Sequence, residues 1–94
     1  MHVVISPKAN EDLVSAFTYL VPRNEQAAFK LVSELESFCM GMLGRHPFIG
    51  KRVQNETAHI RVFYKMGYRI YYRVDEQRIV ILRLIHMAQD DYEV

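Results

Sequence analysis

The segment from Ile60 to His86, IRVFYKMGYRIYYRVDEQRIVILRLIH, decides the fold of this chain. Through most of it, β-branched and aromatic residues alternate with arginines, and this period of two places successive side chains on opposite faces of a strand. The last part, Ile79 to Ile85, is apolar except at Arg83, which is typical of a strand inside a sheet. Short polar or glycine-containing connections at Lys65–Gly67 and Asp75–Gln77 predict turns. We therefore predict three strands in an antiparallel meander.

The alternation also predicts which side chains share a face of the meander. One face would lie against the core, with Ile60, Val62, Ile70, Tyr72 and Val74. Nothing upstream is left to cover the other face, which would display Arg61, Phe63, Arg69, Tyr71, Arg73 and Arg83. Guanidinium groups pair with phosphates or carboxylates, and aromatic rings stack on bases or fill a partner's pocket. The alternative is a solvated face on which arginine stems screen the rings.

The N-terminal half predicts a short strand and two helices. Val3–Ile5 reads as the strand, and Ser6 followed by proline is a favourable helix start. The first helix has its apolar side at Leu13, Ala16, Phe17 and Leu20 and its outer side at Asn10, Glu11, Asp12 and Ser15. Pro22 ends this helix and Asn24 caps the second. The apolar stripe of the second helix runs from Ala27 or Ala28 through Leu31, Leu35 and Phe38 to Met42, with Gly44 as its C-cap.

The predicted order is strand, helix, helix, strand, strand, strand, in one domain spanning residues 1–94. This order favours an α+β fold of two layers, in which a helical hairpin packs on a small, mainly antiparallel sheet. The first strand would join the sheet beside the apolar last strand. The long segment between Gly44 and Ala58 carries Arg45, His46, Lys51 and Arg52. It is either a functional loop or a connector pinned to the core by Phe48 and Ile49.

Composition excludes several function classes. The formal net charge of the 94 residues is +1, so a nucleic-acid partner would depend on local arginine clusters and not on total charge. The single cysteine, Cys39, fits a reducing compartment and reads as a core-margin residue. The sequence shows no leader or membrane segment, which predicts a cytoplasmic protein without a membrane partner. Histidines are scattered, so no metal or cofactor is predicted. His86 is either a proton-transfer group or a structural histidine at a strand end.

Four motifs resemble the ParE/RelE superfamily of bacterial toxins from type II toxin–antitoxin systems. They are Ser6-Pro7-Lys8-Ala9, His46-Pro47-Phe48-Ile49-Gly50, the R-I-x-Y-R-V of Arg69 to Val74, and the I-L-R-L-I-H of Ile81 to His86. The resemblance covers nearly the whole chain, and the family fold is the one predicted above. It implies a toxin that a cognate, ParD-like antitoxin neutralises, in a heteromeric complex; a homodimer or a larger toxin–antitoxin assembly is a further expectation.

The resemblance also implies two possible targets. RelE-like members cleave mRNA on the ribosome with basic residues and a C-terminal acid or base, whereas ParE-like members poison DNA gyrase. Arg69, Arg83 and His86 would be the catalytic set of a nuclease here. However, Met87 stands where many such nucleases place a tyrosine, no glutamate occurs at Val53 or Gln54, and the L-I-H-x-A-x-D ending is more ParE-like. We therefore expect a gyrase inhibitor that is not an enzyme, with a ribosome-dependent endoribonuclease as the alternative.

Partner-binding residues are expected on two surfaces. One is the arginine-and-aromatic sheet face, where Arg61, Arg69, Arg73 and Arg83 would form a positive strip. The other is a hydrophobic margin that the small domain cannot cover itself. Its candidates are Phe17, Tyr19 and Leu20 of the first helix, and the apolar stripe from Leu31 to Met42 where it runs past the sheet edge. An antitoxin that is disordered when free could lay an amphipathic helix on this margin, or add a strand to the sheet edge.

Overall fold

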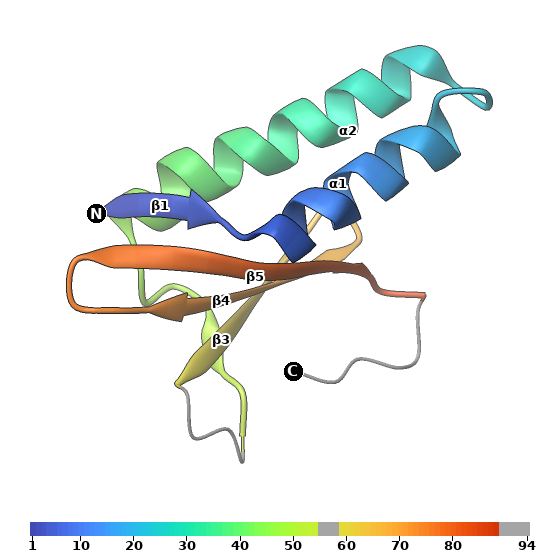
Figure 1. The fold of residues 1–94 in the computed structure, drawn as a ribbon. Coiled ribbons are helices and arrows are strands. Elements are labelled where there is room, and N and C mark those ends of the chain that lie inside the picture. Colours follow the sequence, from blue (N-terminus) through green and yellow to red (C-terminus); the bar gives the residue numbers. More distant parts are fainter. Residues whose placement is uncertain (55–58, 89–94) are drawn as a thin grey trace.

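The computed structural model describes residues 1–54 and 59–88, so residues 55–58 of the long connecting segment and Asp90 of the C-terminal motif lie outside the described residues. The elements are β1 (His2–Ile5), α1 (Pro7–Leu20), α2 (Glu25–Ser37), η1 (Phe38–Leu43), β2 (Lys51–Arg52), β3 (Ile60–Lys65), β4 (Tyr68–Val74) and β5 (Arg78–His86). The strand order is β1-β5-β4-β3-β2, and both helices lie over one face of the sheet (Figure 1). The predicted two-layer α+β fold is confirmed. The two-residue strand β2 was not predicted.

Ser6 joins β1 to α1 and to the sheet at the same time. β1 pairs in parallel with β5, with Val3 opposite Ile79, which confirms the predicted neighbour of the first strand. Where β1 ends, the Ser6 backbone N–H donates to the Ile81 carbonyl at 3.0 Å. The Ser6 hydroxyl donates to the Leu82 carbonyl at 3.2 Å and accepts from the Ala9 N–H at 3.1 Å. The serine of the S-P-x-A motif therefore caps the N-terminus of α1 and also attaches it to β5 through two hydrogen bonds.

The second helix begins as predicted and ends differently. The Asn24 side chain accepts from the Ala27 N–H at 3.0 Å, so asparagine caps α2. After Ser37 the helix continues as a π-helical turn, η1. Gly44 is the C-cap of η1, which confirms the predicted C-cap, and its φ of −61° is an ordinary helical value. A Cβ there would lie 3.2 Å from the Met1 carbonyl oxygen, so the glycine permits close packing of the helix end against β1.

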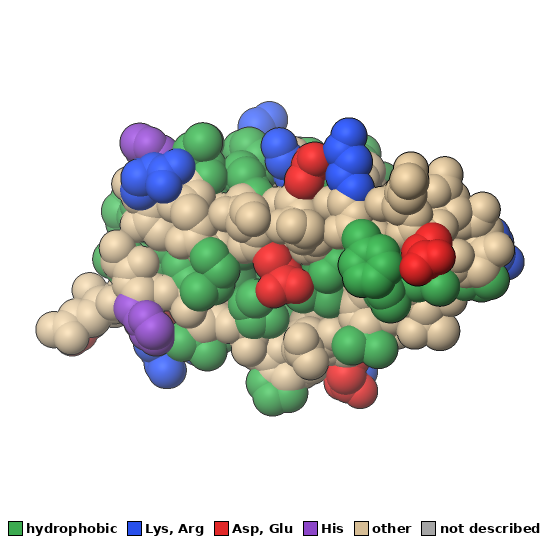
Figure 2. All heavy atoms as spheres, turned by 90° about the horizontal axis from the view of Figure 1, so that it is seen from above, with side chains coloured by type: hydrophobic (Ala, Val, Ile, Leu, Met, Phe, Trp, Pro, Cys, Tyr) green, Lys and Arg blue, Asp and Glu red, His purple; other side chains and the backbone are tan. Residues whose placement is uncertain are grey.

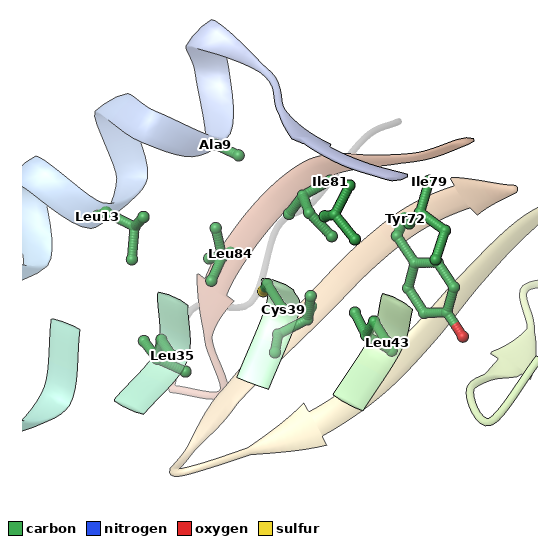
Figure 3. Close-up of a cluster of buried hydrophobic side chains, with 11 residues drawn as sticks. Ala9, Leu13, Leu35, Cys39, Leu43, Tyr72, Ile79, Ile81 and Leu84 are labelled. Carbon is green, nitrogen blue, oxygen red and sulfur yellow. The ribbon is translucent and has the colours of Figure 1, made fainter. Parts of the chain in front are cut away.

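The core lies between the helix layer and the covered face of the sheet (Figure 3). The helices contribute Ala9, Leu13, Leu35, Cys39 and Leu43, and the strands contribute Val3, Ile70, Tyr72, Ile79, Ile81 and Leu84. Cys39 is 1 % exposed, so it belongs to the core itself. Tyr72, the largest fully buried side chain, lies at the end of this cluster with its hydroxyl directed away from the helices.

The predicted faces of β3 are wrong. Phe63 pairs with Ile70, and its ring stacks on that of Phe38 at 4.8 Å between centroids, so it faces the helices. Arg61 pairs with Tyr72 on the same covered face. Ile60 and Val62 lie on the other face, where they are buried along with Val80 and Ile85.

The length of the β3–β4 turn explains this inversion. Lys65 pairs with Tyr68, so the turn contains only Met66 and Gly67, both with positive φ (53° and 81°). This is the geometry of a two-residue hairpin that matches the strand twist. The sequence prediction counted Lys65 as part of the turn. Moving one residue between turn and strand shifts the register by one and transfers every side chain to the opposite face.

Candidate functional site

The C-terminal half of β5 has an edge that no strand within residues 1–54 and 59–88 covers, and α1 lies along it. β1 pairs with β5 only as far as Ile81, and an irregularity in the β4–β5 register follows at Leu82, because Tyr71 pairs with Arg83 and Tyr72 with Ile81. Asp12 of α1 supplies a hydrogen-bond acceptor to this edge. Its carboxylate accepts from the Leu84 N–H at 2.9 Å, and from Nε and Nη2 of Arg83 at 2.8 and 3.0 Å.

Asp12 was predicted on the outer side of α1, and this prediction is wrong. Its side chain is only 14 % exposed. The signal was available, since Asp12 is three residues after Ala9 and four before Ala16, both buried, which places it on the flank of the apolar stripe. What the sequence did not reveal was an unpaired strand edge opposite that flank.

A groove of about 680 Å³ opens between α1, the middle of α2 and this end of the sheet. Its lining combines apolar and polar side chains, namely Asp12, Ser15, Ala16, Tyr19, Leu20, Leu31, Met66, Tyr68, Leu84, His86 and Ala88. Tyr19 and Met66 are among the exposed large hydrophobic residues, at 63 % and 40 % exposure. Two of the three predicted margin residues, Tyr19 and Leu20, therefore line a real concavity. The sequence did not predict that Met66, Tyr68, Leu84 and Ala88 would line this groove, because they come close to α1 only once the sheet has folded.

The polar end of the groove is formed by Tyr68 and His86. Their rings meet edge to face with centroids 5.1 Å apart, and Nδ1 of His86 accepts from the Ala88 N–H at 3.0 Å. Burial, and after it the negative charge of Asp12, raises the pKa of the Tyr68 hydroxyl above its usual value. The phenol therefore stays protonated at neutral pH and can act as a hydrogen-bond donor.

The third margin residue, Phe17, lies elsewhere. Its ring packs edge to face against that of Phe29 at 5.0 Å, in the contact between the two helices. Viewed onto the helix layer, hydrophobic side chains occupy the middle of the surface between charged ones (Figure 2). Val14, Phe29 and Met40 are more than half exposed, so apolar surface also exists outside the groove.

The three residues proposed for catalysis are not brought together. Arg69 pairs with Ile85 and His86 with Tyr68, and since successive residues alternate, Arg69 and His86 lie on opposite faces of the sheet. Nη2 of Arg69 donates to the Met87 carbonyl at 3.4 Å. The Arg83 guanidinium is bound in bidentate fashion by Asp12, which balances its charge. This arrangement places no acid–base pair around a common point.

The predicted positive strip is also divided. Arg69, Tyr71 and Arg73 share the open face as expected, but Nε of Arg73 is paired with Asp75 at 3.0 Å. Arg61 lies on the covered face, where Nη1 donates to the Gly50 carbonyl at 2.7 Å. Four arginines that the sequence pattern places in line thus have separate surroundings. The β3 register turns Arg61 to the covered face, and Asp12 binds Arg83, which pairs with Tyr71 as the predicted face requires.

Among residues 1–54 and 59–88, no group of three or more histidine, cysteine, aspartate or glutamate side chains is placed to hold a metal ion. No helix in the part of the chain that the structure describes is long and apolar enough to cross a membrane.

Comparison with known proteins identifies the family. Residues 3–91 match the model of the family described as "ParE toxin of type II toxin-antitoxin system, parDE". This chain belongs to the ParE toxin family. It is accordingly a toxin of the ParE/RelE superfamily of type II toxin–antitoxin systems. No curated protein matches it.

Solved structures support the assignment. A chain of the toxin–antitoxin complex RelBE2 from Mycobacterium tuberculosis is 30 % identical with a TM-score of 0.69, over 90 % of this ParE-family toxin and 95 % of that chain. A chain of the chromosomal ParDE toxin–antitoxin system from P. aeruginosa is 17 % identical, with a TM-score of 0.62, over 92 % and 95 % of the two chains. The YoeB dimer from Staphylococcus aureus is 22 % identical with a TM-score of 0.53, over the same shares. The last two comparisons establish the fold alone.

Proposed function

We propose that this ParE-family toxin inhibits DNA gyrase by direct binding and catalyses no reaction of its own. The observation that carries the proposal is the separation of Arg69, Arg83 and His86, the three residues that the resemblance implies for a nuclease. Arg69 and His86 occupy opposite faces of the sheet, and Arg83 is engaged by Asp12 through two hydrogen bonds. A general acid and a general base must both lie within hydrogen-bond distance of the same substrate. Side chains on opposite faces of a sheet do not meet this requirement. A binding protein has no such requirement.

A ribosome-dependent mRNA endoribonuclease of the RelE type is the second candidate. Its support is the 30 % identity to a chain of RelBE2, the highest among the three structures named above. In that case the Arg83–Asp12 pair would have to open on the ribosome to release the guanidinium for phosphate. Opening a partly buried, hydrogen-bonded pair of this kind costs several kcal/mol before any contact is gained.

Two assays on the same purified toxin separate these candidates. We expect the toxin to inhibit supercoiling by gyrase and to leave ribosome-bound mRNA intact. Cleavage of mRNA only when ribosomes are present, with unchanged supercoiling, would refute the gyrase proposal and establish the nuclease. Growth that is unimpaired by expression without an antitoxin would instead indicate an interaction module that is not a toxin.

We further propose that a ParD-like antitoxin binds this toxin in the groove along α1. The groove presents apolar side chains such as Leu20, Leu31 and Leu84 beside the polar Tyr68 and His86. An amphipathic helix fits this lining, since its apolar face can cover the leucines while its flank reaches the polar end. A segment that folds as it binds can cover a large surface at moderate affinity per unit area. The same exposed apolar surface favours self-association of the free toxin, as a homodimer or a larger assembly.

A further inference from the structure

The loop from Arg45 to Arg52 presents two adjacent hydrophobic side chains to solvent. Phe48 is 63 % exposed and Ile49 is 44 % exposed. The sequence left open whether these residues pin a connector to the core, and their exposure shows that they do not. Instead, the neighbouring Gly50 is the buried residue of the loop. The apolar pair is therefore held at the surface by the backbone beside it.

Buried hydrogen bonds fix that backbone. The Gly50 N–H donates to the hydroxyl of Tyr72 at 2.8 Å, and the Gly50 carbonyl accepts from Nη1 of Arg61 at 2.7 Å. A Cβ at Gly50 would lie 2.7 Å from the Tyr72 hydroxyl and 2.8 Å from the Val62 carbonyl oxygen, so only glycine permits this approach. The glycine of the H-P-x-x-G motif thus anchors the loop to β3 and β4.

Arg61 also supports the exposed ring. Its guanidinium carbon lies 5.0 Å from the centroid of Phe48, and its Nη1 is 3.4 Å from the Phe48 carbonyl oxygen. The Phe48 ring therefore makes a cation–π contact with the Arg61 guanidinium, whose position is fixed by its hydrogen bond to the Gly50 carbonyl. Because the loop is already ordered, a partner that buries Phe48 and Ile49 loses little conformational entropy, which is the property of an interface anchor.

The loop carries positive charge on both sides of the anchor in the sequence. Arg45, Lys51 and Arg52 are all exposed, and so is the side chain of His46. The ion pairs of residues 1–54 and 59–88 involve Asp12 and Asp75, so Arg45, Lys51 and Arg52 pair with no acid in that part of the chain. Arg52 instead lies 2.7 Å from Nδ1 of His59, through its Nη2. A local cationic rim on a protein of net charge +1 favours an acidic partner at this position.

We infer that the Arg45–Arg52 loop is the surface through which the toxin docks on its target, and that the target supplies an acidic polypeptide surface with an apolar pocket. The inference deepens, and rests on, the proposal that the toxin acts by binding. A protein pocket fits better than a nucleic acid, because Ile49 has no π face on which a base could stack and Arg61 backs the Phe48 ring. One aromatic and one aliphatic side chain, flanked in the sequence by exposed cations, match the core and rim of a protein interface.

This surface is separate from the proposed antitoxin groove. Leu31, in the middle of α2, lines the groove, whereas the loop leaves the helix layer after Leu43, where η1 ends (Figure 1). The intervening twelve residues of helix span roughly 15–20 Å. Substitutions in the loop can therefore be tested without altering the groove.

The first test is growth arrest on expression without antitoxin. The double variant Phe48→Ser/Ile49→Ser removes the anchor, and Val14→Ser/Met40→Ser removes two equally exposed hydrophobic residues from the helix layer (56 % and 52 % exposed). Thermal unfolding of each purified variant checks that it is folded. We expect the loop variant to lose growth arrest and the helix variant to retain it. Growth arrest by a folded loop variant would overturn the inference.

The second test identifies the chemistry of the partner. Purified toxin, its anchor variant and Lys51→Gln/Arg52→Gln are titrated against DNA gyrase and against a fluorescent single-stranded oligonucleotide. We expect gyrase affinity to fall about tenfold or more in both variants, with a weaker salt dependence in the charge variant and no specific oligonucleotide binding. Oligonucleotide binding that falls in the anchor variant would overturn the polypeptide partner in favour of nucleic acid. If wild-type toxin does not bind gyrase while the growth test still separates the variants, the gyrase proposal fails and the docking surface stands.

Discussion

Asp12 and Arg83 form a bidentate ion pair that fastens α1 to the edge of β5, and the same carboxylate accepts the Leu84 N–H. The pair compensates for the shortness of β1, which among the described residues leaves the edge of β5 opposite β4 without a paired strand after Ile81. A sheet edge of this kind exposes unpaired backbone groups, and covering it with a helix removes a site for unwanted strand pairing. The ion pair is therefore a stabilising contact in the resting toxin.

Replacement of Asp12 by alanine should destabilise the fold. It leaves the Leu84 N–H without its acceptor and removes two hydrogen bonds from the Arg83 guanidinium, so we expect the free energy of unfolding to fall by about 2 kcal/mol. Urea denaturation measures the change, with Glu11→Ala, at an exposed position of the same helix, as the control. Equal stabilities of the two variants would show that the carboxylate contributes nothing to the edge.

Removal of the Tyr72 hydroxyl should loosen the Arg45–Arg52 loop. Tyr72→Phe keeps the buried ring but leaves the Gly50 N–H unpaired, which costs about 1–3 kcal/mol. We expect a lower urea midpoint and faster exchange of the Gly50 amide hydrogen. Tyr64→Phe is the matched control, because Tyr64 is 52 % exposed. Unchanged amide exchange in Tyr72→Phe would contradict the anchoring role of the hydroxyl.

Alkaline pH should destabilise the toxin through Cys39. Burial, reinforced by the charge of Glu36, raises the pKa of this thiol to about 12. In the unfolded chain the thiol ionises near pH 8.5, so between these two values the folded state binds more protons and stability falls as pH rises. The stabilising contribution of the neutral Cys39 thiol is fully present at any pH below the pKa that the thiol has in the unfolded chain.

The measurement compares urea midpoints of wild type and Cys39→Ala as a function of pH. From about pH 9 to pH 10, the wild type should lose on the order of 1 kcal/mol more than the alanine variant. Titrating tyrosines are common to both proteins and cancel in the comparison. Parallel pH profiles would mean that the thiol is not held neutral by the fold.

A charge placed in the groove should weaken antitoxin binding. Leu20→Asp introduces a carboxylate where the proposed antitoxin helix buries apolar surface, and we expect the dissociation constant to rise about 10-fold to 100-fold. Val14→Asp carries the same charge on the outer side of α1 and should have little effect. Calorimetry with the cognate antitoxin measures both.

Hydrogen exchange provides an independent check of the groove. The antitoxin should protect α1 and the end of the sheet around Met66 and Leu84. Protection confined to the long connecting segment after Gly44 would exclude the groove as the antitoxin site.

Local sequence signals predicted most of the elements. Ser6 and Asn24 are caps whose side chains bond to the first turn of the helix that follows, so their role depends on neighbours three residues away. The apolar run from Ile79 to Ile85 marked the strand that lies between β1 and β4. The H-P-x-x-G and S-P-x-A motifs located the loop and the helix start, and the structure supplies the hydrogen bonds that explain both.

The fold class, the helix starts and the place of the first strand were thus determined by the sequence alone, because they follow from periodicity and short-range hydrogen bonding. The faces of β3, the partner of Arg83 and the lining of the groove were decided only by the tertiary structure. A two-residue turn at Met66–Gly67 and an irregularity at Leu82 set the registers, and one residue of register moves a whole strand between its faces. Asp12 and Leu84 are separated by more than seventy residues and meet only because β1 ends at Ile5 and leaves an edge for α1 to cover.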